Sequence, residues 1–384
     1  MMGKKIAIIG GGPAGCICAY FALKNPENNV TVYDFKPLMS TVLPTGNGRC
    51  NLAYGEFDFK ELAKFYPRGE KFLYSVFSRF STVDTLDFFE QIGIKTYMQN
   101  DLRYFPVSNS SKEIQKTFIS VLNKHKNFKL IKEKISNLNM LLAKYDAVVV
   151  ATGGNEKFLQ EISSLGIKTI PFKQSLVALK TNIPALYQLA GVSFKNVSAK
   201  FGKYREKGDI LIAHDAITGP LIYKISSLMA FEKIPYNVYF NFTDFENFNE
   251  FDKYFENLIK ENKNKDFVNI ISQIVPYSFA DFLLVISKIP KKMKANQITK
   301  ICRKAIAEKI FSFNIEIIST KKHGETVKAG GVDTDFINPK NMQSKLNSKL
   351  YFIGEVLNVD GFCGGFNLQN CWSTGAICGQ WLAK

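Results

Sequence analysis

A glycine turn close to the amino terminus is the first feature of this sequence that could do chemistry. Gly10, Gly12 and Gly15 have the spacing G-x-G-x-x-G and directly follow the apolar, β-branched run at residues 6–9. In a dinucleotide-binding unit the first glycine permits a tight turn, the second lets a pyrophosphate approach the backbone, and the third lets helix and strand pack closely. The pattern predicts a pyrophosphate site where a strand meets the helix of residues 14–23.

The next strand supplies a carboxylate where a ribose is expected. The run at residues 30–34 ends in Asp34, 19 residues after Gly15. In dinucleotide-binding folds this carboxylate accepts hydrogen bonds from ribose hydroxyls. Because strand, glycines, helix, second strand and acid arrive in order, a dinucleotide site is favoured over a purely structural turn. The cofactor-binding residues expected at this end of the chain are Gly10, Gly12, Pro13, Ala14, Gly15, Asp34, Phe35 and Lys36.

A second glycine turn, at residues 360–365, opens an uncharged helix that reaches Leu382. Such a turn aims free N–H groups and the positive end of the helix dipole at a ligand, and the pyrimidine edge of a reduced flavin carries the negative charge that suits this position. The alternative is a buried helix whose glycines serve packing alone. Two strand ends, after residues 150 and 353, carry small or acidic residues that could also face the cofactor. The binding residues expected in these regions are Ala151, Thr152, Gly153, Gly354, Glu355, Asp360, Gly361, Gly364, Gly365, Phe366, Asn367, Leu368 and Gln369.

Composition bears on whether the protein binds nucleic acid, holds a metal or attaches to a membrane. Lys and Arg number 50 against 34 Asp and Glu, a net charge of +16, which fits a polyanionic partner such as nucleic acid but also fits a merely Lys-rich surface. The seven Cys form no C-x-x-C pair, so we expect no metal site and reduced cysteines of a cytoplasmic protein. The uncharged run at residues 6–23 resembles a membrane span, but its glycines and proline would break a spanning helix, so we expect no membrane attachment.

Several motifs together resemble one known family. They are the glycine turn itself, the string T-G-N-G-R-C-N at residues 45–51, Y-F-P-V-S at residues 104–108, A-G-G-V at residues 329–332, and the stretch from residue 350 to residue 379. On these residues the chain resembles the BaiN/RdsA family of FAD-dependent oxidoreductases. The resemblance implies non-covalent FAD with its isoalloxazine ring beside a loop of seven residues, namely Thr45, Gly46, Asn47, Gly48, Arg49, Cys50 and Asn51.

The resemblance also implies an α/β architecture in three parts. A Rossmann-like FAD-binding domain of the glutathione-reductase or fumarate-reductase type, residues 1–172 and 326–384, is interrupted by a small β-barrel-like domain at 173–246 and 311–325. That domain carries a helical insert at 247–310. Within the insert the apolar residues at 298, 301, 302, 305 and 306 recur at helical spacing, which predicts that they share one buried face.

No second G-x-G-x-x-G follows residue 15, so a dedicated nicotinamide domain is not expected. NAD(P)H is expected to enter transiently as reductant. The family resemblance implies two substrate classes, a uridine in ribosomal RNA and a small conjugated ketone such as a bile-acid dienone. Residues 288–309 hold eight Lys or Arg and one acid, which favours RNA. A small-amine oxidase and a flavin-bearing RNA-binding protein are further alternatives.

Three residues are candidates for catalysis and three for substrate contact. Cys50 and His214 could donate a proton, and Arg49 could stabilise an anionic reduced ring. Arg103 could position carbonyl or phosphate groups, and aromatic rings could stack on a uridine taken out of the RNA. The substrate residues are Arg103, Tyr104 and Phe362.

Overall fold

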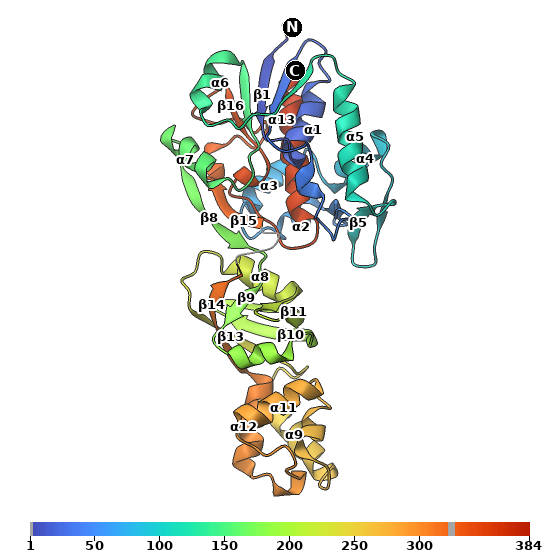
Figure 1. Cartoon of the computed structure of the whole chain (residues 1–384), viewed down its shortest axis with the longest axis vertical. Coiled ribbons are helices and arrows are strands. Elements are labelled where there is room, and N and C mark those ends of the chain that lie inside the picture. The colour runs from blue at the N-terminus through green and yellow to red at the C-terminus, as the bar shows by residue number, and fades with distance from the viewer. Residues whose placement is uncertain (1–2, 322–326) are drawn as a thin grey trace. The chain divides into compact units, whose positions relative to one another are not determined.

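The computed structural model describes residues 3–321 and 327–384. The chain divides into two compact units, Met1–Ser175 with Glu325–Lys384, and Leu176–Gly324 (Figure 1). Each unit has a hydrophobic core of its own. The expected boundary between residues 325 and 326 lies outside the described residues.

A parallel sheet forms the centre of the first unit. Its strand order is β16-β7-β1-β2-β6, and every neighbouring pair is parallel. Short β-branched runs buried on both faces are typical of such sheets. This arrangement confirms the predicted α/β class. The strands are β1 (Lys5–Ile9), β2 (Asn29–Tyr33), β6 (Phe128–Ile131), β7 (Ala147–Val150) and β16 (Leu350–Phe352).

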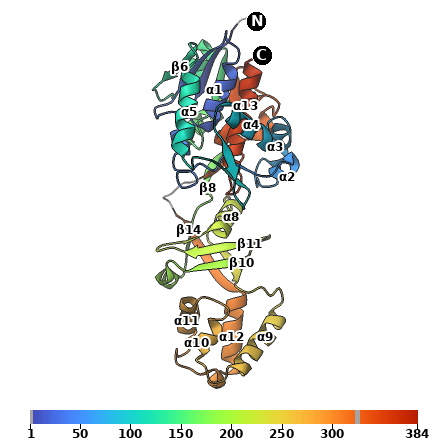
Figure 2. The same ribbon diagram turned by 90° about the vertical axis from the view of Figure 1, so that its right-hand side faces the viewer.

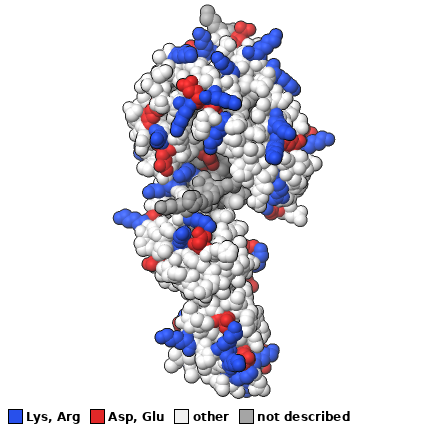
Figure 3. All heavy atoms as spheres, in the orientation of Figure 1, with Lys and Arg blue, Asp and Glu red and all other residues white. Residues whose placement is uncertain are grey.

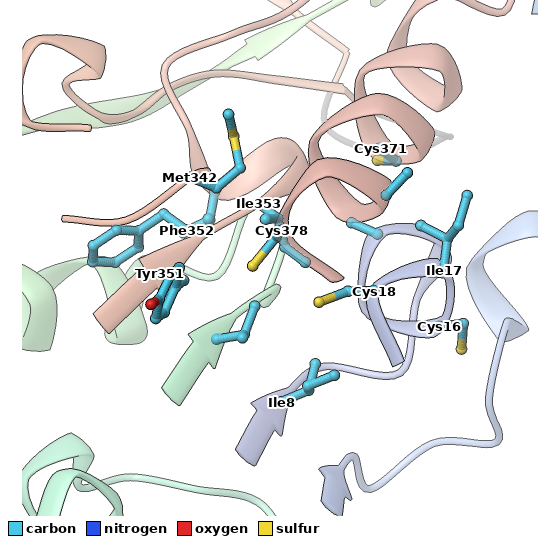
Figure 4. Close-up of a cluster of buried hydrophobic side chains, with 14 of the residues drawn as sticks. Ile8, Cys16, Ile17, Cys18, Met342, Tyr351, Phe352, Ile353, Cys371 and Cys378 are labelled. Carbon is cyan, nitrogen blue, oxygen red and sulfur yellow. The ribbon is translucent and has the colours of Figure 1, made fainter. Parts of the chain in front are cut away.

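Two helices from opposite ends of the chain, α1 (Pro13–Ala22) and α13 (Phe366–Leu382), lie side by side (Figure 1). Glycines on α13 permit the close approach, since a Cβ at Gly375 would lie 2.4 Å from the carbonyl oxygen of Ala14. Figure 4 shows cysteines and aliphatic side chains between these helices and the sheet. The helix pair therefore brings the two glycine turns, 350 residues apart in sequence, into one half of the unit.

Smaller elements complete the first unit. A three-stranded antiparallel sheet has the order β3-β5-β4, with β3 (Ala53–Tyr54), β4 (Thr96–Met98) and β5 (Arg103–Pro106). The strands β8 (Thr169–Ser175) and β15 (Val327–Val332) form a two-stranded ribbon. The remaining helices are α2 (Phe59–Ala63), α3 (Glu70–Phe77), α4 (Thr82–Gln91), α5 (Ser111–Asn123), α6 (Leu138–Lys144) and α7 (Glu156–Ser164).

The second unit contains a closed barrel with the order β10-β11-β12-β9-β14-β13. A closed barrel leaves no unpaired strand edge. One helix, α8 (Pro220–Leu228), packs on β11. The barrel strands are β9 (Leu179–Thr181), β10 (Ser193–Phe201), β11 (Tyr204–Ile212), β12 (Ile217–Thr218), β13 (Tyr236–Asn241) and β14 (Phe313–Thr320).

A helical segment inserted between β13 and β14 shares its core with the barrel (Figure 2). The ring of Phe279 lies 4.9 Å from that of Phe194 on β10 and 5.5 Å from that of Phe313 on β14. Barrel and insert therefore form one compact unit. The helices of the insert are α9 (Phe248–Glu261), α10 (Phe267–Ile271), α11 (Tyr277–Ile286) and α12 (Lys300–Phe311).

The predicted buried face of α12 is confirmed at Ile306 and wrong at Ile301. The side chain of Ile301 is 82% exposed, and the buried stripe is Arg303, Ile306, Ala307 and Ile310. Arg303 can occupy the stripe because its guanidinium pairs with Asp252 at 2.5 Å. Apolar periodicity gave the wrong phase since a paired charge, rather than an apolar residue, fills one core position.

Candidate functional site

A cleft of about 410 Å³ lies in the first unit at the carboxyl ends of the parallel strands. Ligands of open α/β sheets bind at this edge. The residues predicted to bind the cofactor that line the cleft are Gly10, Gly12, Pro13, Ala14, Asp34, Phe35, Lys36, Ala151, Thr152, Gly153 and Glu355.

The amino-terminal glycine turn gives the cleft a backbone floor. Gly10 has φ +109°, and a Cβ there would lie 2.3 Å from the carbonyl oxygen of Ala151 at the end of β7. A Cβ at Gly15 would lie 1.9 Å from the carbonyl oxygen of Gly10. After Pro13, which has no N–H, the first N–H groups of α1 have no acceptor within the helix. This is the geometry that a pyrophosphate requires.

The end of β2 forms one side of the cleft. One carboxylate oxygen of Asp34 accepts hydrogen bonds from the backbone N–H of Gly11 at 2.7 Å, and the other accepts from Lys36 N–H at 2.8 Å. These bonds fix the carboxylate at the cleft. The adjacent Phe35 ring is 58% exposed, and the ammonium groups of Lys36 and Lys134 lie 5.6 and 5.9 Å from its centroid. An exposed ring in a cleft offers a stacking surface for a base.

Two polar side chains in the cleft are poised for a bound polar group. The hydroxyl of Thr152 is buried and has no hydrogen-bond partner among the described residues. A buried hydroxyl without a partner is costly, and a ligand atom would satisfy it. Burial and the neighbouring Asp360 carboxylate raise the pKa of Glu355 to about 7. The cleft therefore fits a dinucleotide by its backbone floor, its ribose carboxylate and its unpaired hydroxyl.

The carboxylate of Asp360, which the sequence analysis assigns to the cofactor, is held by protein groups. It is fully buried and forms a two-pronged ion pair with Arg68, and the hydroxyl of Ser175 donates to it at 3.1 Å. Asp360 does not line the cleft. Its role in the structure is to anchor the turn that precedes α13.

Most predicted side chains at the start of α13 also bind protein. The amide of Asn367 makes two 2.9 Å bonds with the backbone of Gly361, and Phe366 stacks on Phe65 at 4.6 Å. The Gln369 side chain faces α4, where it donates to the Thr85 hydroxyl at 2.7 Å. Leu368 is partly buried against the core. The backbone turn itself contains Gly364 and Gly365, both with positive φ.

The loop of residues 45–51 contacts this turn. A Cβ at Gly365 would lie 2.9 Å from both the Asn51 side-chain oxygen and the carbonyl oxygen of Ala53. With its amide oriented to satisfy both groups, Asn51 accepts from Gly365 N–H and donates to the Ala53 carbonyl. The structure thus brings together the loop and the helix start that the sequence analysis assigns to the flavin ring.

Left-handed backbone shapes this loop at four positions, Gly46, Asn47, Gly48 and Cys50. Cys50 adopts φ +63° with its side chain fully buried, and burial raises the pKa of its thiol to about 12. Thr45 closes the loop, since its carbonyl oxygen accepts from Cys50 N–H at 2.9 Å. Non-glycine residues in this region are uncommon and cluster at functional sites.

The other predicted residues lie in different places. Arg103 begins β5 and pairs with Asp101 at 2.5 Å, while Tyr104 and Phe362 are partly buried against the core of the first unit. Gly15 and Gly354 support the turns from outside the cleft. His214 belongs to the second unit, where it is exposed in the turn between β11 and β12.

Sequence reasoning missed the cleft wall that follows β6. The short apolar run at residues 128–131 was a usable signal, because parallel strands end at the same edge and residues after them enter the cleft. The cleft residues that were not predicted are Ile9, Tyr33, Thr41, Glu133, Lys134, Ile135, Gly154, Asn155, Phe158, Ile353 and Cys371.

No helix within the described ranges is long and apolar enough to cross a membrane. Comparisons with known proteins find relatives of 25 to 27% identity that match over nearly the full length. The ribosomal RNA dihydrouridine synthase of Escherichia coli (strain K12) is 25% identical over 403 residues, which cover 97% of this chain and 96% of that protein. The enzyme of the same name from Haemophilus influenzae is 27% identical over 409 residues, 98% of each chain.

A third relative has a different substrate in its name. The 3-dehydro-bile acid delta(4,6)-reductase of Clostridium scindens is 25% identical over 410 residues, 99% of each chain. Among solved structures, 3-ketosteroid delta1-dehydrogenase from Sterolibacterium denitrificans aligns with all of this chain at 10% identity and a TM-score of 0.49. The predicted class of enzyme, a flavoprotein oxidoreductase, is confirmed.

The family model described as the HI0933-like protein Rossmann domain matches residues 4–381, nearly the whole chain. The match includes both glycine turns, the loop of residues 45–51 and the entire second unit. The chain belongs to the HI0933-like Rossmann family.

Proposed function

We propose that this protein binds FAD without a covalent bond and reduces a uridine of ribosomal RNA to dihydrouridine. The observation that carries the proposal is the full-length match to two relatives named ribosomal RNA dihydrouridine synthase. The contact between the loop of residues 45–51 and the start of α13 supports it, because the family resemblance implies that both segments lie beside the flavin ring.

The residues that would hold FAD follow from the site. The turn before α1 binds the pyrophosphate, and Asp34 accepts hydrogen bonds from the ribose hydroxyls. Phe35 lies beside the adenine. The hydroxyl of Thr152 forms a hydrogen bond with the part of FAD between the adenosine and the ring. The loop of residues 45–51 and Gly365 enclose the ring end. When bound, the flavin supplies hydride to an activated C=C bond.

Cys50 and His214 are the two proposed donors of the proton that the other carbon of that bond must receive. Cys50 holds its proton at neutral pH, because burial raises the pKa of its thiol to about 12, and it lies in the loop beside the ring end. His214 is an exposed imidazole of the second unit. We expect Cys50→Ser and His214→Gln to separate these roles, since loss of the true donor lowers turnover without lowering FAD content.

NAD(P)H is the proposed reductant. The fold of the described residues includes one parallel sheet with one glycine fingerprint, so we propose that a nicotinamide ring enters the open face of the flavin and leaves before the substrate. Anaerobic mixing with NADH and with NADPH, followed at the visible flavin absorbance, measures which of the two reduces the protein.

The experiment that tests the function is a map of dihydrouridine in the ribosomal RNA of cells with and without the gene. Purified protein and NADPH are then added to the unmodified RNA. We expect one lost site that the protein restores, and that a cofactor-free Gly15→Ala variant does not restore. An unchanged map would exclude RNA reduction.

A small conjugated ketone is the second candidate, because the Clostridium scindens relative is named as a bile-acid reductase. The same protein preparation should then oxidise NADPH with a steroid dienone as the acceptor. Turnover with the dienone, combined with an unchanged dihydrouridine map, would establish this alternative instead.

A further inference from the structure

Arg49 differs from the other arginines with buried or partly buried side chains. Arg68 pairs with Asp360, Arg103 with Asp101, and Arg303 with Asp252. Arg49 forms no ion pair with a carboxylate in the described part of the chain. A partly buried guanidinium without a counter-charge is unfavourable, so the site carries a positive charge that a ligand can neutralise.

Protein groups fix the position of this guanidinium. Its Nε donates to the carbonyl oxygen of Gly46 at 3.3 Å, and its centre lies 4.2 Å from the centroid of the fully buried Phe105 ring. A stacked guanidinium uses its flat face on the ring and keeps the N–H groups of its edge for an acceptor in its plane. Two parallel N–H groups match two oxygens of a phosphate.

A second guanidinium lies over the same ring. The centre of Arg103 is 5.7 Å from the Phe105 centroid, and Asp101 neutralises its charge through a 2.5 Å ion pair. Like charges in contact with one ring would repel each other, and Asp101 removes the charge of only one of them. One net positive charge therefore remains over the Phe105 ring, in the loop whose Asn51 contacts Gly365.

We propose that Arg49 binds a phosphate group of the molecule that approaches the flavin ring, with Phe105 and Gly46 as its positioning groups. The shared chemistry is a phosphate oxyanion, which RNA carries next to the target uridine and NAD(P)H carries in its pyrophosphate. The RNA source rests on the proposed function, whereas the dinucleotide source requires only that the protein use a nicotinamide reductant.

The test uses FAD-loaded protein with two binding measurements. The first is the dissociation constant of a fluorescein-labelled RNA oligonucleotide that contains the unmodified uridine, from anisotropy at several salt concentrations. The second is the dissociation constant of NADPH from the rate of anaerobic flavin reduction. The variants are Arg49→Ala and Arg49→Lys, with Arg79→Ala as the matched control, since Arg79 is exposed and lies outside the site.

We expect Arg49→Ala to weaken one of the two ligands by about 10- to 100-fold, as the loss of a charge-assisted hydrogen bond does. Arg49→Lys keeps the charge but not the paired donors, so it should recover only part of the loss, and Arg79→Ala should change neither constant. If RNA is the source, the slope of log affinity against log salt falls by about 0.7 to 0.9.

Three results would overturn the inference. In the first, the dissociation constants of RNA and of NADPH both stay unchanged in Arg49→Ala. In the second, the wild-type protein binds neither ligand. In the third, Arg49→Lys and Arg49→Ala change only the flavin spectrum and the FAD content, which would assign Arg49 to the flavin ring. The proposed function fails separately: an unchanged dihydrouridine map with a weakened NADPH constant leaves the phosphate site in place. A restored map with unchanged constants rejects Arg49 and keeps the function.

Discussion

The two units carry the same net charge and differ in how that charge is arranged. The first has 28 Lys and Arg against 20 Asp and Glu, and the second has 22 against 14, so each has a net charge of +8. Figure 3 shows blue side chains scattered over the visible face of both. The positive charge of the chain as a whole therefore does not indicate where a polyanion binds.

Ion pairs within the second unit neutralise part of the positive charge of its most basic segment, residues 288–309. Of the eight cations at residues 288–309, Lys291, Lys294 and Arg303 pair with carboxylates of the same unit. In the first unit, by contrast, Arg49 has no carboxylate partner within the described ranges, and it lies in a loop of left-handed residues that contacts the start of α13. A single positioned charge is a better indicator of function than a charged segment.

The largest expected effect compares a glycine of the cofactor turn with one in the barrel. Gly15→Ala would place a Cβ 1.9 Å from a backbone oxygen, whereas a Cβ at Gly208 on β11 would meet the Leu221 side chain at 3.3 Å. We expect Gly15→Ala to lower the free energy of unfolding by roughly 5 kcal/mol and to abolish FAD binding. Gly208→Ala should change it by about 1 kcal/mol. Denaturant unfolding and the flavin-to-protein absorbance ratio measure both, and equal effects would contradict the comparison.

The next effect compares two buried ion pairs, one in each unit. Arg68→Ala leaves the fully buried Asp360 carboxylate without its guanidinium, which should cost about 3 kcal/mol and disturb the turn of α13. Arg303→Ala leaves Asp252, whose side chain is 15% exposed and can reach water, and should cost about 1 to 2 kcal/mol. We expect FAD content to fall only in Arg68→Ala. Chemical unfolding measures both losses of stability. A larger loss in Arg303→Ala than in Arg68→Ala would contradict the expected order of the two ion pairs.

The dinucleotide half of the site was predictable because its determinants are local. Strand, glycine turn, helix and Asp34 are consecutive in sequence, and all of them meet at the observed cleft. The wall formed by Glu133, Lys134 and Ile135 was not predictable in this way, since it depends on β6 pairing with β2 across nearly 100 residues. Sheet order, unlike strand content, is not encoded in a short window.

The direction in which polar side chains point could not be predicted from the sequence either. Asp360 and Gln369 lie in the correct motif, yet their polar groups bind Arg68 and Thr85 instead of facing the cleft. A motif specifies backbone turns and small residues well, because those follow from local sterics. Which way a polar side chain points depends on partners nearly 300 residues away, and these appear only in the folded chain.

The smallest effect concerns pH and the cleft carboxyl Glu355. Its pKa rises from the ordinary value of 4.5 to about 7 through burial and Asp360, so the folded apoprotein disfavours the charged form. The stability that this group contributes is complete below pH 4.5 and is lost as the pH rises through 7. Because Glu355 is only half-buried and solvent screens it, we expect a loss of roughly 1 to 2 kcal/mol by pH 8.5.

Glu355→Gln removes the ionisation and should stabilise the apoprotein relative to wild type at pH 8.5 but not at pH 4.5. The control is Glu308→Gln, which replaces an exposed carboxylate of the second unit. The difference in stability between this variant and wild type should not increase between pH 4.5 and pH 8.5. Chemical unfolding of both variants at pH 4.5, 6.5 and 8.5 measures the difference. A constant gap between Glu355→Gln and wild type across this range would mean that the cleft carboxylate is fully solvated, and that the first unit does not differ from the second in the electrostatics of its acids.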